Sequence, residues 1–349
     1  MKFWMRVMRV MRGRGLVLGL LLSMAGGGVY GLADLPLVNT ETLNLDGIES
    51  LALSYGHDEL ILRESESEDL VIKEYMTRDR DRYRVQVSRS PGTLRIRRGG
   101  RPWLYWNWKA RAEIYLPRSF QGNLRIASGS GILSAETDLH GYKTVDINVT
   151  SGKVSLNGVS GETVSVHVAS GELGMRTIGG KSFVSVSSGK MGIDGMSGEE
   201  HHIKVTSGRL RVGSLEGQSA LELSSGTIAV DQVRGGVEAR VSSGSLEMGD
   251  FAGSGSFGVN SGNLRVNLGE LPEDLRFRLS SGSVELGIPR DIPFNLDTIT
   301  NSGNVRINEG GKEVFKISGN STVLRPIGTG AERIIFALIN SGNLVINRR

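Results

Sequence analysis

Residues 203–230 read IKVTSGRLRVGSLEGQSALELSSGTIAV, and they contain the pattern from which the fold can be predicted. Two Ser-Gly pairs, Ser207-Gly208 and Ser225-Gly226, stand 18 residues apart in it. The residues three and five positions before each glycine, and two and four positions after it, are apolar, and polar residues alternate with most of them. This period of two is typical of β-strands and excludes an amphipathic helix. Each repeat therefore predicts two short strands joined at a Ser-Gly corner.

The same pattern continues through the middle of the chain. Ser-Gly pairs follow one another at intervals of 18 to 20 residues from Gly152 to Gly282, with less regular copies at Gly129, Gly303 and Gly342. A second glycine, nine residues after the first, predicts another corner in most repeats. The regular corners are Ser151-Gly152, Ser170-Gly171, Ser188-Gly189, Ser207-Gly208, Ser225-Gly226, Ser243-Gly244 and Ser261-Gly262.

A repeat of this length cannot bury its apolar side alone, but coiling the chain stacks equivalent columns into a continuous core. The sequence therefore predicts an all-β fold, a single-stranded parallel β-solenoid (β-helix) with one turn, or rung, for about every 18–20 residues. No proline occurs between Pro117 and Pro272, where every turn must donate backbone hydrogen bonds to its neighbours. A β-propeller is disfavoured because its blades need about 40–45 residues.

The corner residues are expected to have a structural role. Glycine tolerates positive φ, which suits a tight corner. The serines that precede the glycines would stack as a ladder of hydroxyl groups along one edge of the coil. We favour this interpretation over a row of nucleophiles.

The first residues have the features of an export signal. Residues 1–15 contain five basic residues and no acidic one, and an apolar run, Leu16 to Ala25, follows. Gly31 and Ala33 place small residues three and one positions before a cut after Ala33. Together these features predict a secretory signal peptide, with a retained membrane anchor as the alternative. The protein is then expected to be periplasmic, on the cell surface or extracellular.

Composition narrows the classes of function. The chain has no cysteine, which excludes disulfides, thiolate metal sites and cysteine nucleophiles. The formal net charge of +4 is carried by the predicted signal peptide: without its five basic residues the count is 36 basic against 37 acidic, a net of −1. A nucleic-acid partner is therefore not expected. No cofactor or metal site is expected either, because the five histidines form no ligand pattern.

The flanks of the repeat keep the strand alternation without the regular marker. We predict four segments: a signal peptide at 1–33, an N-terminal cap with degenerate β rungs at 34–118, the regular Ser-Gly solenoid at 119–303, and C-terminal rungs with a cap at 304–349. Caps are expected because the open ends of a solenoid expose unpaired strand edges.

The sharpest feature outside the repeat lies at residues 101–111. Flat aromatic rings next to cations suit stacking on sugars, anionic polymers or a protein partner. We therefore take this segment as a candidate binding surface, and a hydrophobic cover for the end of the solenoid as its alternative. Its candidate residues are Arg101, Trp103, Tyr105, Trp106, Trp108, Lys109 and Arg111.

Catalysis is the weaker expectation. Asp194, Asp231 and Asp250 follow their corner glycines by five or six residues and could gather at one corner, as in a polysaccharide-acting enzyme. Acidic residues are also ordinary in surface turns. The run GSGSFG at 253–258 matches a dinucleotide-binding pattern, but an ordinary repeat follows it where a helix would be needed.

The chain resembles a known family from its N-terminal region to its end. The features are LALSYG at 51–56, IYLP at 114–117, the serial Ser-Gly repeats, and SGNLVI at 341–346. They resemble the bacterial "putative adhesin" domain of unknown function, which includes LiaG-like cell-envelope proteins. The resemblance implies an exported β-solenoid of the cell envelope and supplies no catalytic residues. We expect a non-catalytic, adhesin-like binding or structural protein whose partner is an envelope polymer or protein. The alternatives are a polysaccharide-acting enzyme on a β-helix scaffold, and an accessory component of an envelope stress response.

Overall fold

The computed structural model describes residues 35–101, 108–270 and 274–349. Within these ranges 27 strands join in one open sheet, and the only helix is a 3-10 turn, η1 (Asp81–Tyr83). The prediction of an all-β, solenoid-like fold is confirmed. No helix of the described ranges is long and apolar enough to cross a membrane. The predicted signal peptide at 1–33 lies outside them.

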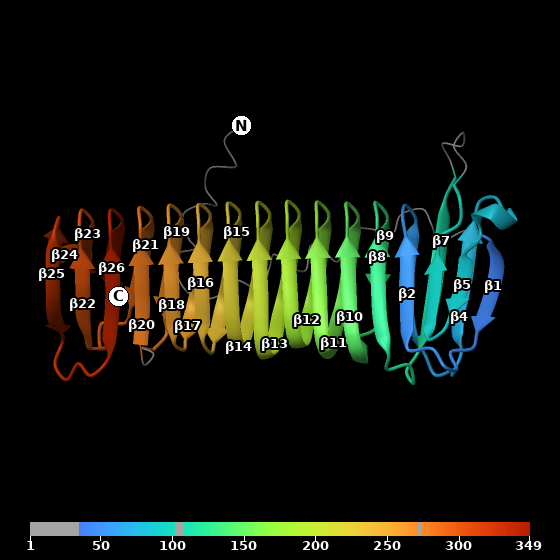
Figure 1. Cartoon of the computed structure of the whole chain (residues 1–349), viewed down its shortest axis with the longest axis horizontal. Helices are drawn as coiled ribbons and strands as arrows, with labels where there is room; N and C mark the ends of the chain where they lie inside the picture. Colours follow the sequence, from blue (N-terminus) through green and yellow to red (C-terminus); the bar gives the residue numbers. More distant parts are fainter. Residues whose placement is uncertain (1–34, 102–107, 271–273) are drawn as a thin grey trace, which may run out of the picture.

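The centre of the molecule is a regular coil, drawn from green to orange in Figure 1. Each strand pairs in parallel with its equivalent one repeat later, so that Leu210 lies beside Ile228, and Ile228 beside Leu246. The strands of the coil are β10 (Leu139–Val149), β11 (Lys153–Val168), β12 (Glu172–Val186), β13 (Lys190–Val205), β14 (Arg209–Leu223), β15 (Thr227–Arg234), β16 (Val237–Val241), β17 (Ser245–Ala252), β18 (Gly255–Val259), β19 (Asn263–Leu268), β20 (Asp274–Leu279) and β21 (Ser283–Ile288).

The coil has two long faces. Segments that lead into the Ser-Gly corners form the front face in Figure 1, with the corners along the upper edge, and segments that follow the corners form the back face. The apolar columns point inward between the two faces: Val205, Leu223 and Val241 are at most 2% exposed. A continuous core therefore runs along the body.

Close stacking explains the glycines of the Ser-Gly corners. A Cβ atom at Gly208 would lie 2.6 Å from the carbonyl oxygen of Gly189 and 2.5 Å from Cγ1 of Val186. The expected reason, positive φ, is wrong here, because Gly208 and its equivalents do not have it. Positive φ occurs instead at the second corner, for example at Gly217 (122°) and Gly235 (125°). The preceding serines of the regular corners are exposed in a row along this edge.

At the N-terminal end the chain does not stack its turns in sequence order. The first turn, β2 (Ser50–Tyr55) and β3 (Glu59–Ser65), lies between a later turn, β6 (Thr93–Arg97) and β7 (Ala110–Pro117), and the start of the coil, β8 (Asn123–Ser128) and β9 (Ile132–Ala135). Antiparallel strands then close the end. They are β1 (Leu37–Leu43), β4 (Leu70–Met76) and β5 (Gln86–Ser90).

The C-terminal end repeats this arrangement. The last turn, β26 (Ile334–Ile339) and β27 (Asn343–Arg348), is inserted between the turn of β20 and β21 and the turn of β22 (Phe294–Thr300) and β23 (Asn304–Glu309). The antiparallel strands β24 (Lys312–Ser318) and β25 (Ser321–Ile327) lie outermost. The first turn, β2 and β3, and the last turn, β26 and β27, are thus both held inside the stack.

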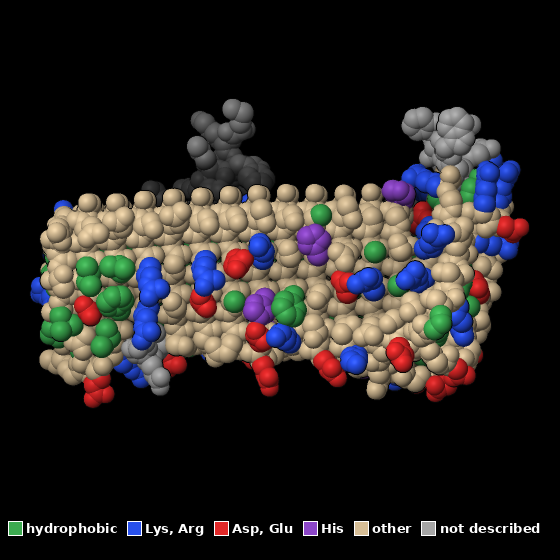
Figure 2. Space-filling view, viewed as in Figure 1, with side chains coloured by type: hydrophobic (Ala, Val, Ile, Leu, Met, Phe, Trp, Pro, Cys, Tyr) green, Lys and Arg blue, Asp and Glu red, His purple; other side chains and the backbone are tan. Residues whose placement is uncertain are grey.

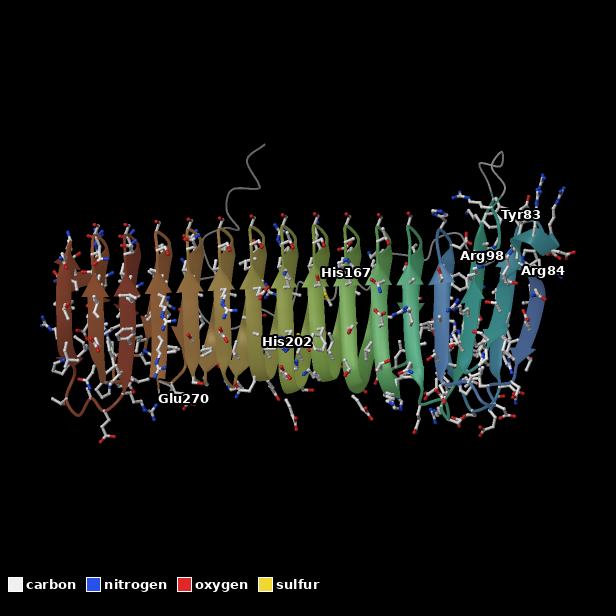
Figure 3. All side chains as sticks on the ribbon, in the orientation of Figure 1. Tyr83, Arg84, Arg98, His167, His202 and Glu270 are labelled. Atoms are coloured by element: carbon white, nitrogen blue, oxygen red, sulfur yellow. The ribbon has the colours of Figure 1, made fainter. Side chains whose placement is uncertain are left out.

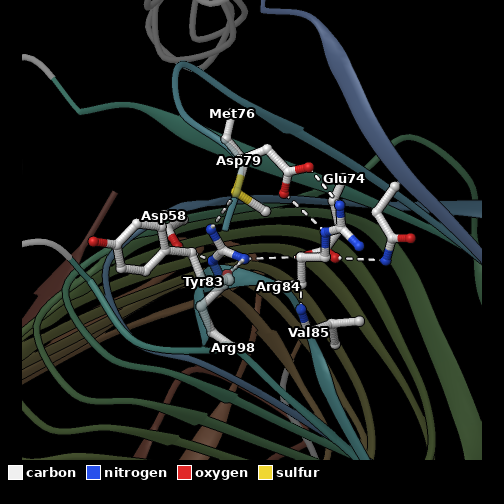
Figure 4. A network of polar contacts seen from close by, with 9 residues as sticks. Asp58, Glu74, Met76, Asp79, Tyr83, Arg84, Val85 and Arg98 are labelled. Carbon is white, nitrogen blue, oxygen red and sulfur yellow. Dashed lines mark hydrogen bonds and ion pairs between the residues drawn. The ribbon is translucent and has the colours of Figure 1, made fainter. Parts of the chain in front are cut away.

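A buried network of charges holds the N-terminal cap together (Figure 4). Arg98 forms ion pairs with Asp58 and with Glu74, where Nη1 lies 2.8 Å from Oε1 of Glu74. The three side chains are 8%, 8% and 1% exposed. Glu74 also accepts hydrogen bonds from the backbone N–H of Val85 and the side chain of Asn39. The guanidinium thus joins β4 and the turn before β3 to the segment after β6, and Glu74 links β1 to them through Asn39.

Candidate functional site

The predicted binding segment at 101–111 is only partly described. Trp103, Tyr105 and Trp106 lie outside the described residues. Arg101 and Lys109 are exposed. Trp108 is 6% exposed and packs edge-on against Tyr83, with Arg98 5.3 Å from its ring. Trp108 therefore covers the end of the solenoid, and the expectation that it presents a ring to a ligand is wrong.

Arg111 is also engaged within the cap. Its guanidinium lies 4.5 Å from the ring of Tyr75, and its Nε lies 3.6 Å from Oε1 of Glu113. Because the Arg111 guanidinium already contacts side chains of its own and the adjacent strand, it is poorly placed to bind a polymer. Among the described residues of the segment, only Arg101 and Lys109 are classed as exposed.

A second candidate site, not singled out from the sequence, lies in the middle of the front face. Two neighbouring depressions of about 600 and 390 Å³ are hollowed there. The larger depression is floored by small residues, including Ala220, Gly236, Ser254 and Ser256. The smaller depression contains His167, which lies on the same face as His202 in Figure 3. Side chains of His202 and Ala220 line both.

A stacked pair of rings stands between the two depressions. Phe183 of β12 and His202 of β13 are register partners on adjacent turns, and their rings lie 5.0 Å apart at an angle of 4°. Phe183 is 39% exposed, so its ring is offered to solvent. Figure 3 labels His202 on this face, and Figure 2 shows hydrophobic and histidine side chains side by side near the middle of the same face. We call Phe183 and His202 the aromatic pair.

Charged groups hold the aromatic pair in place. Glu200 accepts contacts of 2.5 Å from both Nζ of Lys181 and Nε2 of His202. These hydrogen bonds, from Lys181 first and His202 second, lower the pKa of Glu200. Lys181 also lies 5.6 Å from the ring of Phe183. An exposed ring flanked by planar polar and charged groups, next to shallow depressions, is suited to stacking on a sugar ring or another flat polar unit.

Directly beneath the aromatic pair lies a buried polar column that the sequence analysis missed. Ser182, His201 and Ser219 occupy the inward position seven residues before their corner glycines, where neighbouring turns have Val164 and Val237. Nδ1 of His201 lies 2.7 Å from Oγ of Ser182, and Nε2 lies 2.9 Å from the carbonyl oxygen of Glu216. Because a carbonyl only accepts, Nε2 carries the proton and Ser182 donates to Nδ1.

This pair resembles a Ser-His dyad only in its chemistry. Ser182 and His201 are both 0% exposed, so the hydroxyl has no access to a substrate. Burial lowers the pKa of His201 and keeps it neutral. The pair therefore satisfies polar groups inside the core.

The pKa of His201 predicts a pH dependence of stability. As pH falls below about 6.5, histidine in the unfolded chain gains a proton that buried His201 does not. The free energy of unfolding should then fall by up to about 1.4 kcal/mol per pH unit until the lowered pKa is reached. Urea unfolding between pH 7.5 and 5 should show this loss in the wild type and a smaller one in His201→Val. Equal losses in both proteins would contradict the assignment.

Two of the three acidic residues considered for catalysis, Asp231 and Asp250, are paired with different arginines. Asp231 forms an ion pair with Arg211 at 2.9 Å, and Asp250 forms one with Arg234 at 2.5 Å. In the described ranges no group of three or more His, Asp or Glu side chains could hold a metal ion. The glycine run at 253–258 continues as strand β18, so the helix needed for dinucleotide binding is absent there.

Comparison with known proteins places these features in a family. Three similar solved structures are a "putative adhesin" from Parabacteroides merdae (14% identity, TM-score 0.39, 71% of this chain and 91% of that one) and two proteins from Parabacteroides distasonis. The latter are a "putative lipid binding protein" (12%, 0.37, 88% and 96%) and a "putative adhesin" (11%, 0.36, 90% and 98%). No curated protein gives a significant match.

A family model matches most of the chain. The model for Toastrack DUF4097 matches residues 48–250 and again residues 182–346. The two matches overlap in the regular coil and together include both capped ends. The chain belongs to the Toastrack DUF4097 family.

Proposed function

We propose that this chain is an exported, non-catalytic binding protein of the bacterial cell envelope, and that it binds an extended polar polymer along its front face. The observation that carries the proposal is the aromatic pair between two shallow depressions. A long face with open grooves fits an extended chain better than a small substrate, which proteins usually enclose.

Export is part of this proposal and rests on the predicted signal peptide at 1–33. A mature net charge of −1 gives no general attraction to anionic polymers. Recognition would then depend on shape, stacking and local hydrogen bonds, which the aromatic pair and its neighbours Lys181 and Glu200 supply. A glycan of the envelope is the polymer class that combines these properties.

Replacing Phe183 by alanine tests the proposal. Loss of the ring should weaken binding to isolated envelope polysaccharide by about tenfold, equal to ~1.4 kcal/mol, because the stacking surface is removed. Binding is measured by co-sedimentation of the purified full chain with insoluble envelope fractions. Ile132→Ala is a matched control, because Ile132 is an apolar residue that is even more exposed than Phe183 (50% against 39%) and starts a strand of the other face. Unchanged binding by a folded Phe183→Ala protein would overturn the assignment of this face.

A further inference from the structure

The C-terminal end of the front face presents an apolar patch with a charge at its centre. Figure 2 shows it as a green group around one red side chain, next to a blue stripe. The green group comes from the outward side chains of three adjacent strands, β26, β22 and β25. Its most exposed members are Ile299 (38%), Leu324 (71%), Ile334 (43%) and Leu338 (41%).

Strand register places an outward side chain from each of five strands, β18, β20, β26, β22 and β25, in one row. From β18 to β25 the row is Ser256, Arg276, Phe336, Asp297 and Leu324. Phe336 of β26 is the middle member, with Arg276 on one side and Asp297 on the other. The row therefore runs from a small side chain through a cation, a ring and an anion to a protruding apolar side chain.

Asp297 is unusual in this setting. In the part of the chain that the structure describes, its carboxylate forms no ion pair or hydrogen bond, and its register neighbours are Phe336 and Leu324. When a partner covers the surface around it, a carboxylate among apolar side chains is stabilised by a nearby cation. The same charge disfavours insertion of the patch into the apolar interior of a membrane.

We propose that a second copy of this chain covers the patch, related by a two-fold axis that runs parallel to β26. Such an axis reverses the order of the row and keeps its level along the strands. Phe336 then meets Phe336 of the second copy, and Arg276 of each copy faces Asp297 of the other. The row is complementary to itself, which is the condition for an isologous dimer.

The ends of the row also match in shape. Leu324 of one copy meets Ser256 of the other, at the edge of the larger depression. The protruding side chain of Leu324 thus packs against a part of the depression that is lined by serine and glycine. One row higher, Gly258 of one copy meets Thr322 of the other, and Arg278 meets Ile299, so no pair of like charges is created.

The face, not the open edge, is the surface that the second copy covers. Strand β25 is the edge strand of the front face and contains Arg325 and Pro326. Charged residues and proline in an edge strand disfavour its pairing with a strand of another molecule. Arg325 also lies 4.6 Å from the ring of Phe315, where it covers the end of the core.

The size of the contact sets the expected affinity. Five strands spaced about 4.8 Å apart and about 20 Å long give roughly 500 Å² of projected area on each copy. The total, about 1,000 Å², is at the lower limit of specific interfaces. We therefore expect a reversible dimer with a dissociation constant in the micromolar range.

Charge reversal and its repair test the proposal. Asp297→Arg places arginine opposite Arg276 at two symmetry-related points and should raise the dissociation constant about 100-fold. Arg276→Asp should have a similar effect. The double variant Arg276→Asp, Asp297→Arg restores both pairs with opposite polarity and should return the dissociation constant to within about threefold of wild type. Analytical ultracentrifugation of the full chain from about 1 to 100 μM brackets this range.

Two controls make the outcome decisive. Lys204→Glu reverses a charge on the front face outside the five strands and should leave the dimer intact. Thermal unfolding shows whether each variant is folded. A wild-type monomer at every concentration, or a double variant as weak as the single ones, would overturn the proposal. Co-sedimentation of a monomeric wild type with anionic vesicles would instead assign the patch to a lipid surface.

Discussion

Gly208→Ala is expected to lower the free energy of unfolding by about 2–4 kcal/mol. The reason is the close stacking of the Ser-Gly corners. The added methyl would overlap the carbonyl oxygen of Gly189 at 2.6 Å and Cγ1 of Val186 at 2.5 Å. The side chain of Val186 can rotate, but the carbonyl belongs to a backbone fixed by parallel pairing on both sides. The two turns must separate locally or lose their hydrogen bonds at this corner.

Gly174→Ala is the matched control for this prediction. Gly174 lies within a strand of the coil, has no positive φ, and leaves open space where its Cβ would be. The substitution should be neutral or stabilise the protein by a few tenths of a kcal/mol, because alanine is less flexible in the unfolded chain. Urea unfolding and hydrogen exchange of the turns around residue 208 measure both effects. Equal stability of the two variants would show that the corner is not closely packed.

Arg98→Met is expected to destabilise the N-terminal cap by about 3–5 kcal/mol. The substitution leaves the carboxylates of Asp58 and Glu74 buried without their cation. It also removes the guanidinium from the face of Trp108. Because solenoids unfold locally, the loss should be confined to β1 and β4–β7 at first, while the central coil stays protected.

Hydrogen exchange followed by mass spectrometry measures this loss peptide by peptide. Arg84→Met is the control, because Arg84 and its partner Asp79 are each 34% exposed and solvent screens their attraction. That variant should cost less than about 1 kcal/mol. Faster exchange in the central coil than in the cap, or equal effects of both substitutions, would contradict the role given to Arg98.

The regular coil could be predicted because its information is local. Columns of apolar residues at fixed distances from each glycine determine which side chains point inward, and residues such as Val205 and Leu223 are buried as that pattern requires. The same alternation predicts that the side chain of His201 points into the core and that of His202 points to the solvent. Aligning the repeats would also have placed Phe183 beside His202, since the two occupy equivalent positions on adjacent turns. The aromatic pair could therefore be predicted from the repeat alone.

The ends could not be predicted because their pairings are not local. Strand β2 pairs with β8 across some 70 residues, and β26 pairs with β20 across a comparable distance. Any strand with alternating apolar residues can form the hydrogen bonds and bury the apolar side chains at such an edge. Periodicity therefore does not determine which turns are neighbours. The reason for glycine at the Ser-Gly corners could not be predicted either, because the sequence shows where glycine occurs but not how closely the backbone of the next turn approaches it.

Insertion of the last turn changes how the molecule can be completed. In a simple coil each turn stacks on the one before it, and a chain released early is merely shorter. Here the place between β20 and β22 is filled by β26, which follows both strands in the sequence. A chain lacking β26 and β27 would leave two parallel edges exposed in the middle of the stack. Insertion of β26 and β27 is therefore the step that joins the turn of β22 and β23 to the rest of the stack.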